Sequence, residues 1–449
     1  MFRLLFIQFI RSKTAIIALA LIFTTGIISL FIGKQFLVKQ EKTIAAVTKF
    51  QQEHIERNAH LNKDNFGLLM YYLRFGLINK PEQLAGLSIG QRDVNLSVQS
   101  VTIRALEAQK YDTDLNNPYN LLSGNLDLSF VVIYLFPLLI IVFTFNLLSE
   151  EKEGGTWQLV TAQSASSIKY LLAKLAVRAV TVVIVLVLLL LLSLPILSIQ
   201  WNKAFTLFAA TCICYLIFWI TLCFLFVRFK KSSGFNAVAL LSSWVLLTAL
   251  LPAGINNIIT NKYPVPEALQ TIIKNRDGYH NKWDVDKSIT ISKFYELYPQ
   301  FKKYSLPDKT FSWLWYYAMW HMGDHDAMQD AKEMRSKLLQ REKASRTVAA
   351  FIPTMHTQLQ LNDITKTSML NYITFLDSTT AFHEKMRLYF YPKIFENDDV
   401  RSEDWKKFRP EYFSDCYTVN WVKTLLPLAI AISFTLLLSC INFKNKYEV

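Results

Sequence analysis

Six long apolar runs decide what this chain can fold into. Each has about the 20 residues that a helix rising ~1.5 Å per residue needs to cross a hydrocarbon layer about 30 Å thick. The runs lie near residues 14–37, 128–148, 172–199, 203–227, 235–258 and 421–443. Because the apolar residues are gathered into these runs instead of recurring at the spacing of a soluble core, the sequence predicts an all-α membrane protein with six transmembrane helices.

Two long polar stretches complete the predicted organisation, and we expect both to be mainly helical and extracytoplasmic. The segments we expect are 1–38, the first transmembrane helix; 39–126, a stalk and re-entry segment; 127–258, helices two to five with a loop at 149–171; 259–420, a helical domain; and 421–449, the last helix and a cytosolic tail.

The stalk and the helical domain are predicted from local patterns. Residues 38–62 contain neither Gly nor Pro, and their apolar residues recur near helical spacing: Ile44, Val47, Ile55 and Ala59. A similar stripe indicates an amphipathic helix in the second segment: Ala327, Ala331, Met334 and Leu338, with Glu333 and Lys337 exposed. An Asn, Asp, Pro and Gly cluster predicts a turn before residue 128, with Leu121 and Leu122 at the membrane surface. No strand pattern is apparent.

Basic residues predict the orientation. Arg3, Arg11 and Lys13 precede a first run that is too long for a signal peptide and shows no small-residue cleavage site, so we expect an uncleaved anchor. With six spans, both termini and the short 149–171 and 228–234 loops share one side. Twelve of the Lys and Arg residues lie there against four Glu, which satisfies the positive-inside rule. Topology therefore explains the formal net charge of +13, and nucleic acid is not an expected partner.

Local signatures of catalysis are missing. The sequence contains no GxxxxGK[ST], GxSxG, HExxH or GxGxxG, so we expect no ATPase or other catalytic site and no cofactor in this chain. The apolar runs carry no central carboxylate or histidine: Asp127 lies at an edge, and Lys174, Arg178 and Lys423 lie near ends, where they can snorkel. A proton-driven transporter is therefore disfavoured. Four of five cysteines lie in the runs, without a CxxC metal pattern.

One histidine pair raises a metal hypothesis. His321 and His325 are four residues apart beside Asp324 and Asp326, but Gly323 weakens a helix between them, and no third His or Cys stands close in sequence. We therefore expect no metal site here. A third possible class is a membrane enzyme with its active site in this segment. That function would need His321, His325 and His356, or paired carboxylates, gathered in a deep pocket.

The loop after the second run is the candidate functional site. Ser149 is predicted to cap a turn of carboxylates, the glycines to break the helix, and Thr156 to start a second short helix with its apolar side chains exposed. The candidate residues are Glu150, Glu151, Glu153, Gly154, Gly155, Thr156, Trp157, Leu159 and Val160. Two interpretations remain open: an interfacial turn anchored by Trp157, or a knob that docks in the groove of a soluble partner and passes motion to the adjoining spans.

The chain resembles a known family, the type-two ABC exporter permeases. Within that family it resembles the bacterial subfamily with a large extra domain before the last span. The resemblance covers nearly the whole chain. It rests on residues 117–163, on AKL at 173–175, on SGFNAVAL at 233–240, on YPVPE at 263–267, and on FHEKMRLYFYPKIF at 382–395.

The resemblance implies a coupling loop that contacts an ATPase. Glu151, Glu153, Gly155, Thr156 and Lys174 look like its positions, although the glycine pair and Trp157 depart mildly from the family's pattern. It also implies a second permease half, either another copy or a similar chain, and two ATPase subunits that bind ATP and Mg. The chain would then export or extract a substrate at the bacterial inner membrane, amid membrane lipid. The alternative is a mechanotransmitter that moves an envelope protein partner without transport.

Overall fold

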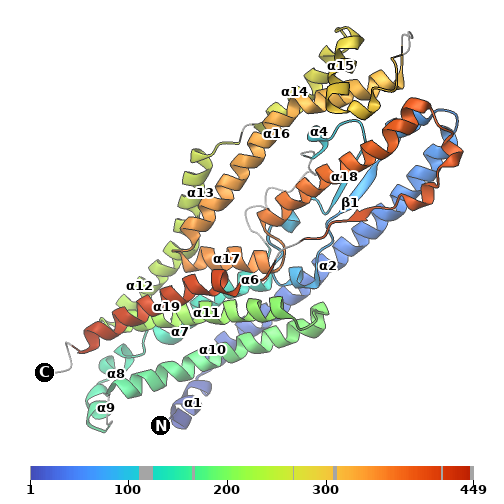
Figure 1. Ribbon diagram of the computed structural model, residues 1–449. Helices are drawn as coiled ribbons and strands as arrows, with labels where there is room; N and C mark the ends of the chain where they lie inside the picture. The colour runs from blue at the N-terminus through green and yellow to red at the C-terminus, as the bar shows by residue number, and fades with distance from the viewer. Residues whose placement is uncertain are drawn as a thin grey trace.

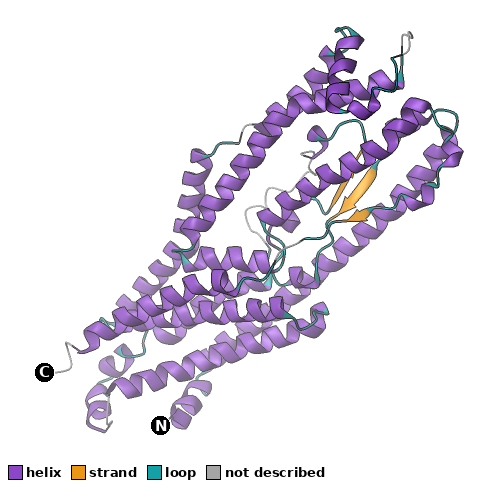
Figure 2. Cartoon of the chain, in the orientation of Figure 1, coloured by secondary structure: helices purple, strands orange, loops and turns teal. Residues whose placement is uncertain are grey.

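Helices dominate the computed structural model, which describes residues 2–110, 125–163, 167–265, 267–306, 311–415 and 418–444 (Figure 2). Six of its helices are long and apolar enough to cross a membrane. The predicted class, an all-α membrane protein with six spans, is therefore confirmed. The predicted re-entry residues Leu121 and Leu122 lie outside the described part of the chain.

The spans follow the apolar runs closely. Two of them, the second and the fifth, are helices interrupted by a five-residue π-turn. The spans are α2 (Lys13–Leu61), α6 (Leu128–Phe130) with η3 (Val131–Leu135) and α7 (Phe136–Thr144), α10 (Ser167–Leu197), α11 (Lys203–Val227), α12 (Ser233–Val245) with η4 (Leu246–Leu250) and α13 (Leu251–Lys262), and α19 (Trp421–Lys444). A short helix that the sequence analysis did not predict, α1 (Phe2–Ile10), precedes them.

The fourth span, α11, forms the centre of the membrane bundle. Its side chains Tyr215 and Trp219 are fully buried, and it packs against α7, α10 and α19. In contrast, α12 exposes Val238 and α19 exposes Phe434, each more than half accessible. Apolar side chains on these outer faces suit a hydrocarbon environment, since burial in lipid costs them nothing.

The two π-turns place backbone carbonyls where side chains of other elements reach them. The Tyr215 hydroxyl donates to the carbonyl of Ile133 in η3 at 2.9 Å, and the Trp244 indole donates to that of Tyr134 at 3.1 Å. The Thr354 hydroxyl donates to the carbonyl of Leu247 in η4. Within a membrane a carbonyl without a donor is costly, so these contacts join α11, α12 and α17 (Pro353–Ile364) to the interrupted spans.

The first span continues without a break into the polar region, where α2 forms a long stalk beside the other outer elements (Figure 1). A small three-stranded sheet lies there, in the order β2–β1–β3. Its strands are β1 (Phe75–Ile78), β2 (Val98–Val101) and β3 (Glu411–Tyr412). Phe75 pairs with Val101 in an antiparallel register, and Leu77 pairs with Glu411 in a parallel one.

The sheet is an element that the sequence analysis did not predict. Strand β1, FGLI, is four residues long and buried on both faces, so it lacks the polar and apolar alternation by which a half-buried strand is recognised. Its partner β3 is more than 300 residues away in sequence, and the Gln51 side chain on the stalk accepts from the Gly76 amide at 2.8 Å. Tertiary contacts hold this sheet.

Helices of 4 to 37 residues, joined by short turns, build the rest of the polar region beyond the membrane bundle, which is called the outer domain below. They are α3 (Phe66–Tyr72), α4 (Glu107–Lys110), α14 (Glu267–Asn281), α15 (Lys287–Leu297), α16 (Trp313–Ala349) and α18 (Met369–Glu396), with short turns η1 (Gln83–Gly86), η2 (Gly90–Asp93), η5 (Pro299–Phe301), η6 (Val400–Ser402) and η7 (Trp405–Lys407). Their core is aromatic, with Phe294, Trp315 and Tyr391 buried. A buried ion pair joins Arg387 to Asp324 at 2.9 Å. Helix α16 continues through Gly323.

A polar junction connects this domain to the second span. Asp127 caps that span by accepting from the Phe130 amide at 2.8 Å, and its other oxygen accepts from the Ile89 amide at 2.8 Å. Asp127 is buried because both of its oxygens are used in this way. The Ser88 hydroxyl donates to the side-chain oxygen of Asn362 on α17 at 2.7 Å. Movement of the second span is thereby tied to the outer domain.

Candidate functional site

The candidate loop is a pair of short helices, α8 (Ser149–Glu153) and α9 (Trp157–Gln163), between the second and third spans. They lie at the end of the molecule where both chain termini lie (Figure 1). Gly154 and Gly155 separate the helices, and Gly155 has φ +70°, a conformation in which a Cβ would be strained. The glycines thus end the first helix, and the Val160 amide donates to the Thr156 carbonyl at the start of the second.

Glu151 acts as an internal clamp. Its carboxylate accepts from the Tyr170 hydroxyl at 3.0 Å and from the Lys174 ammonium at 2.9 Å, both on α10. Its second oxygen accepts from Thr156 across the glycine pair. The Glu151 and Lys174 side chains retain only 16% and 11% exposure. A charged hydrogen bond is stronger when water is partly excluded, so this cluster fixes the loop to the third span.

Arg178 adds a second anchor one turn further along α10. Its guanidinium donates to the Phe143 carbonyl and, at 3.2 Å, to the Asn146 side chain at the end of the second span. It also lies 3.8 Å from the Glu150 carboxylate and 5.8 Å from the Phe9 ring of α1. Lys174 and Arg178 therefore turn inward to the loop rather than only snorkelling to water.

Glu153 reaches the fifth span. Its two oxygens accept from the Ser233 amide at 2.8 Å and the Ser233 hydroxyl at 2.9 Å, at the amino terminus of α12. A carboxylate is favourable there because free amides and the helix dipole both carry positive charge. Ser149 does not cap α8, contrary to expectation; it is buried, and its Oγ contacts the Ser233 Oγ at 2.7 Å.

The apolar side of the loop differs from the prediction. Trp157 and Val160 are half-buried instead of exposed, and Trp157 packs against the hydrophobic core of the bundle. This follows from the anchoring of α8, which holds α9 against the spans. The side chain of Leu159 is outside the described residues. The described residues that the loop leaves exposed are Glu150, Lys152, Glu153, Gly154, Gly155, Thr156, Gln158 and Ala162.

Sequence reasoning missed Tyr170, Asn146 and Ser233 as members of this site. The sequence nevertheless contains two signals for this site. Lys174 and Arg178 stand four residues apart, so they share one face of a helix, and Ser232 and Ser233 precede an apolar run, as capping residues do. Which carboxylate each would meet depended on tertiary structure.

A second candidate is the histidine pair of the outer domain. His321 and His325 line a cavity of about 380 Å³ together with His383, whereas His356 lies apart on α17, with Nε2 2.8 Å from the Thr424 carbonyl. Burial, followed by the charge of Arg387, holds the pKa of His321 and that of His383 well below their usual range. Among the described residues no group of three His, Cys, Asp or Glu side chains has a metal-binding arrangement.

Two families of known proteins match two separate parts of the chain. Residues 91–210, which contain the α8–α9 loop, match the family described as "ABC-2 membrane transporter related". Residues 268–413, which form most of the outer domain, match "Domain of unknown function (DUF3526)". No curated protein and no solved structure matches the chain. The first match supports a permease-type transporter subunit rather than an enzyme, and together with the six spans it indicates a multi-pass membrane protein.

Proposed function

We propose that this chain is the transmembrane subunit of an ATP-driven exporter or extractor in the bacterial inner membrane, and that a separate ATPase subunit, which itself binds ATP and Mg, docks on the α8–α9 loop. The observation that carries the proposal is the bracing of one short loop to three spans. Glu151 holds the third span through Lys174, Glu153 holds the fifth through Ser233, and α8 itself follows the second. A push on this loop would move all three together.

The exposed chemistry of the loop suits a docking surface. Glu153 accepts hydrogen bonds from Ser233 yet is exposed, and Gly154 and Gly155 leave backbone open beside it. A partner groove can pack closely on glycine backbone while a basic side chain meets the carboxylates. Trp157, packed inward, stiffens the loop from the membrane side and is not the contact itself.

Six spans supply half of a transporter of this kind, so we propose a second permease half as a further partner. It is another copy of this chain or a similar chain. The exposed apolar faces of α12 and α19 are the surfaces on which that half and membrane lipid compete. We also propose that both termini lie in the cytosol, together with the loop that receives the ATPase.

The test is co-purification of the ATPase from mild detergent with the tagged chain. Glu153→Lys should lower ATPase recovery and activity at least tenfold while membrane insertion is kept, because the change lies outside the spans. Glu296→Lys is the matched control, since it makes the same charge change on exposed α15 of the outer domain. Equal recovery in Glu153→Lys and in the control would refute the docking assignment.

A mechanotransmitter is the second candidate, favoured by the unbroken α2 and the polar junction at Asp127. In that case ATP-driven movement would pass to an envelope partner. A lateral opening or continuous cavity in a solved dimer would favour transport, and an apolar, closed interface would favour force transmission.

A further inference from the structure

The outer domain contains a cavity of about 380 Å³ between α16 and α18. Small-molecule pockets commonly enclose roughly 300–1,000 Å³, so the cavity has room for a small ligand. Two of the side chains that line it, His321 and His383, retain only 6% and 1% exposure. Two others, Leu297 and Thr380, are exposed. The cavity therefore leads from the surface of the domain to enclosed polar groups.

The hydrogen-bond donors that line the cavity already have acceptors. Arg387 donates to two backbone carbonyls of the segment before α4 and pairs with Asp324 at 2.9 Å. The Tyr298 hydroxyl donates to the Glu384 carboxylate, and the Thr380 hydroxyl donates to a carbonyl of its own helix. The cavity wall therefore offers few free donors to a ligand.

Its histidines, in contrast, have free acceptors. Nε2 of His383 lies 2.8 Å from the Thr102 carbonyl, and a carbonyl only accepts, so the neutral ring keeps a lone pair on Nδ1. His321 makes no hydrogen bond with any described residue. Its Nδ1 is enclosed, so a ligand would meet Nε2. Burial, followed by the charge of Arg387, holds the pKa of both histidines well below the usual range. Both rings are therefore neutral, and each can accept a hydrogen bond.

One carboxylate of the cavity has no cation. Asp324 pairs with Arg387 at 2.9 Å, and Glu107 pairs with Lys110 at 2.8 Å. Glu384 is half-buried and makes no ion pair with any residue in the described ranges. These three carboxylates and two cations leave one negative charge at the cavity. A partly enclosed carboxylate without a cation is unfavourable, so a positively charged ligand would be stabilised there.

We propose that this cavity binds a small organic amine in its protonated form. The ammonium lies between Glu384 and His321. Tyr298 brings these two residues together, because its ring lies 4.9 Å from the His321 ring and its hydroxyl donates to Glu384. The carbon chain lies against Leu106 and Met328, which line the same cavity.

The hydrogen-bond pattern and the charge both favour this class of ligand. An ammonium has three donors and no acceptor, which complements a wall with free acceptors, few free donors and one unpaired negative charge. A metal ion fits less well, since no group of three His, Cys, Asp or Glu side chains in the described chain has a metal-binding arrangement. The site goes beyond the proposed coupling function and does not depend on the ATPase.

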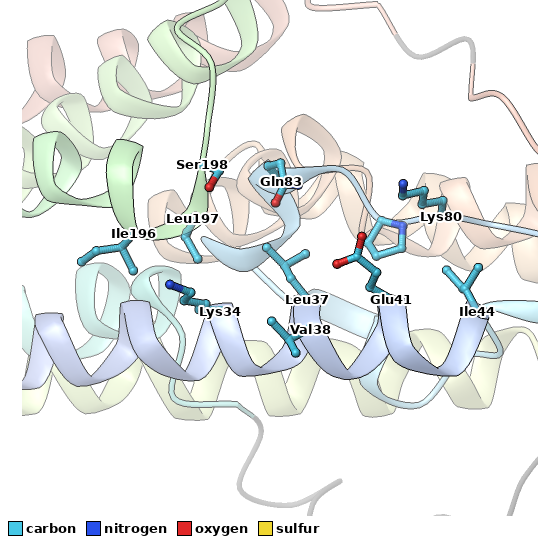
Figure 3. Close-up of a pocket in the computed structure, with 11 residues that line it drawn as sticks. Lys34, Leu37, Val38, Glu41, Ile44, Lys80, Gln83, Ile196, Leu197 and Ser198 are labelled. Atoms are coloured by element: carbon cyan, nitrogen blue, oxygen red, sulfur yellow. The ribbon is translucent and has the colours of Figure 1, made fainter. Parts of the chain in front are cut away.

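A second hollow, beside the stalk, provides a matched control. It encloses about 160 Å³ between α2, the segment at 80–83 and the end of α10. Its one carboxylate, Glu41, lines it together with Lys34 and Lys80. Figure 3 shows Lys34 and Glu41 projecting from the same side of α2. Since lysines outnumber the carboxylate there, this hollow should not attract an amine, and Glu41→Gln should leave amine binding unchanged.

The test is a ligand-observed NMR titration of the full chain in phosphatidylcholine nanodiscs. The probes are n-butylamine, butanoate and butan-1-ol, which have the same chain length and differ in charge. After subtraction of the signal from empty nanodiscs, n-butylamine should bind at least tenfold more tightly than the other two. Glu384→Gln should raise its dissociation constant at least fivefold, although the amide oxygen can still accept from Tyr298. Glu41→Gln should bind like the unmodified chain.

Four outcomes would overturn the site. Equal binding of the three probes would show that charge is not recognised, and tighter binding of butanoate would indicate an anion site at Arg387. Displacement of n-butylamine by one equivalent of Zn²⁺ would indicate a metal site. Unchanged binding in Glu384→Gln would remove that carboxylate from the site. Because no ATPase is present in the nanodiscs, none of these results bears on ATPase co-purification, and failure of co-purification would leave the amine site intact.

Discussion

Three carboxylates within four residues of α8 have three different environments. Glu151 is largely enclosed and accepts from three donors, Glu150 is half exposed near two cations, and Glu153 is exposed but caps another span. Their neighbouring positions in the sequence make the three residues look interchangeable. Only Glu151 is enclosed, so we expect only its replacement to destabilise the loop. A buried acceptor that disappears leaves its donors unsatisfied, which costs more than the bond itself contributed.

We therefore expect Glu151→Gln to loosen the loop. The amide has no charge for Lys174 and cannot accept from Thr156, Tyr170 and Lys174 together, so local opening should become easier by about 1–3 kcal/mol. Hydrogen exchange of peptides covering residues 149–163, measured on the full chain in lipid nanodiscs, should accelerate about tenfold. Glu296→Gln, the same change on an exposed site, should leave it unaltered. Unchanged exchange in Glu151→Gln would show that the clamp does not hold the loop.

The buried histidines give the outer domain a predictable pH dependence. The pKa values of His321 and His383 are held well below the usual range by burial and then by Arg387, while an unfolded histidine titrates near about 6.5. As the pH falls below that value, the unfolded chain takes up the protons first. Stability is therefore fully present above pH ~6.5 and is lost below it, by about 1 kcal/mol per pH unit for each histidine.

Thermal unfolding followed by tryptophan fluorescence should show a lower Tm at pH 5.5 than at pH 7.5. His321→Phe, which keeps a ring among Phe294 and Tyr298, should reduce that difference without abolishing it, because the pKa values of His383, His356 and His54 are lowered as well. His280→Gln removes an exposed histidine of α14 and should leave it unaltered. Equal Tm values at the two pH values would mean that the histidines do not determine acid stability.

At the scale of elements, the π-turns explain why distant helices hold their positions. Each turn widens a span, and side chains from other elements contact its carbonyls: Tyr215 and Trp244 at η3, and Thr354 at η4. The second span is thus bound to α12, and α12 is bound to α17 of the outer side. This series of hydrogen bonds parallels the clamp at the other end of the same spans.

Helix α17 provides a controlled test of that contact. Thr354→Val keeps the shape of the side chain but leaves the Leu247 carbonyl without its donor, at a cost of about 1 kcal/mol. Thr357, one turn later, is buried with a hydroxyl that has no partner within the described chain. Thr357→Val should therefore be neutral or stabilising. Denaturant titration in bicelles should separate the two variants, and equal effects would show that the π-turn contact contributes nothing.

The six spans could be predicted because hydropathy is a local property, and so could the helix break at Gly154 and Gly155. What could not be predicted depends on contacts distant in sequence. Strand β1 forms by pairing with β3, which is distant in sequence. Similarly, Glu153 accepts hydrogen bonds from Ser233, 80 residues away. The inward packing of Trp157 follows from the Glu151 clamp, which no local pattern encodes. Similarly, His383 joins His321 only through the packing of α18 on α16.

At the scale of the whole molecule, the distribution of basic residues and the arrangement of the helices indicate the same orientation across the membrane. The termini and the α8–α9 loop gather at one end (Figure 1), and the contact of Glu153 with Ser233 brings the 228–234 loop to the same end. This end includes Arg11, Lys13 and Lys152. Since short segments rich in Lys and Arg stay in the cytosol, the opposite end, with α14 to α16, is expected outside the cytoplasmic membrane.

Cysteine labelling in a cysteine-free variant of the full chain tests this polarity. Lys152→Cys on α8 and Lys302→Cys after η5 are both exposed substitutions at opposite ends of the molecule. A membrane-impermeant maleimide added to intact spheroplasts should label only the cysteine at 302, and the one at 152 should react at least tenfold more after lysis. The reverse pattern would place α8 where no ATP-dependent partner can reach it. It would therefore remove the proposed coupling, even though the fold and the clamp would remain as described.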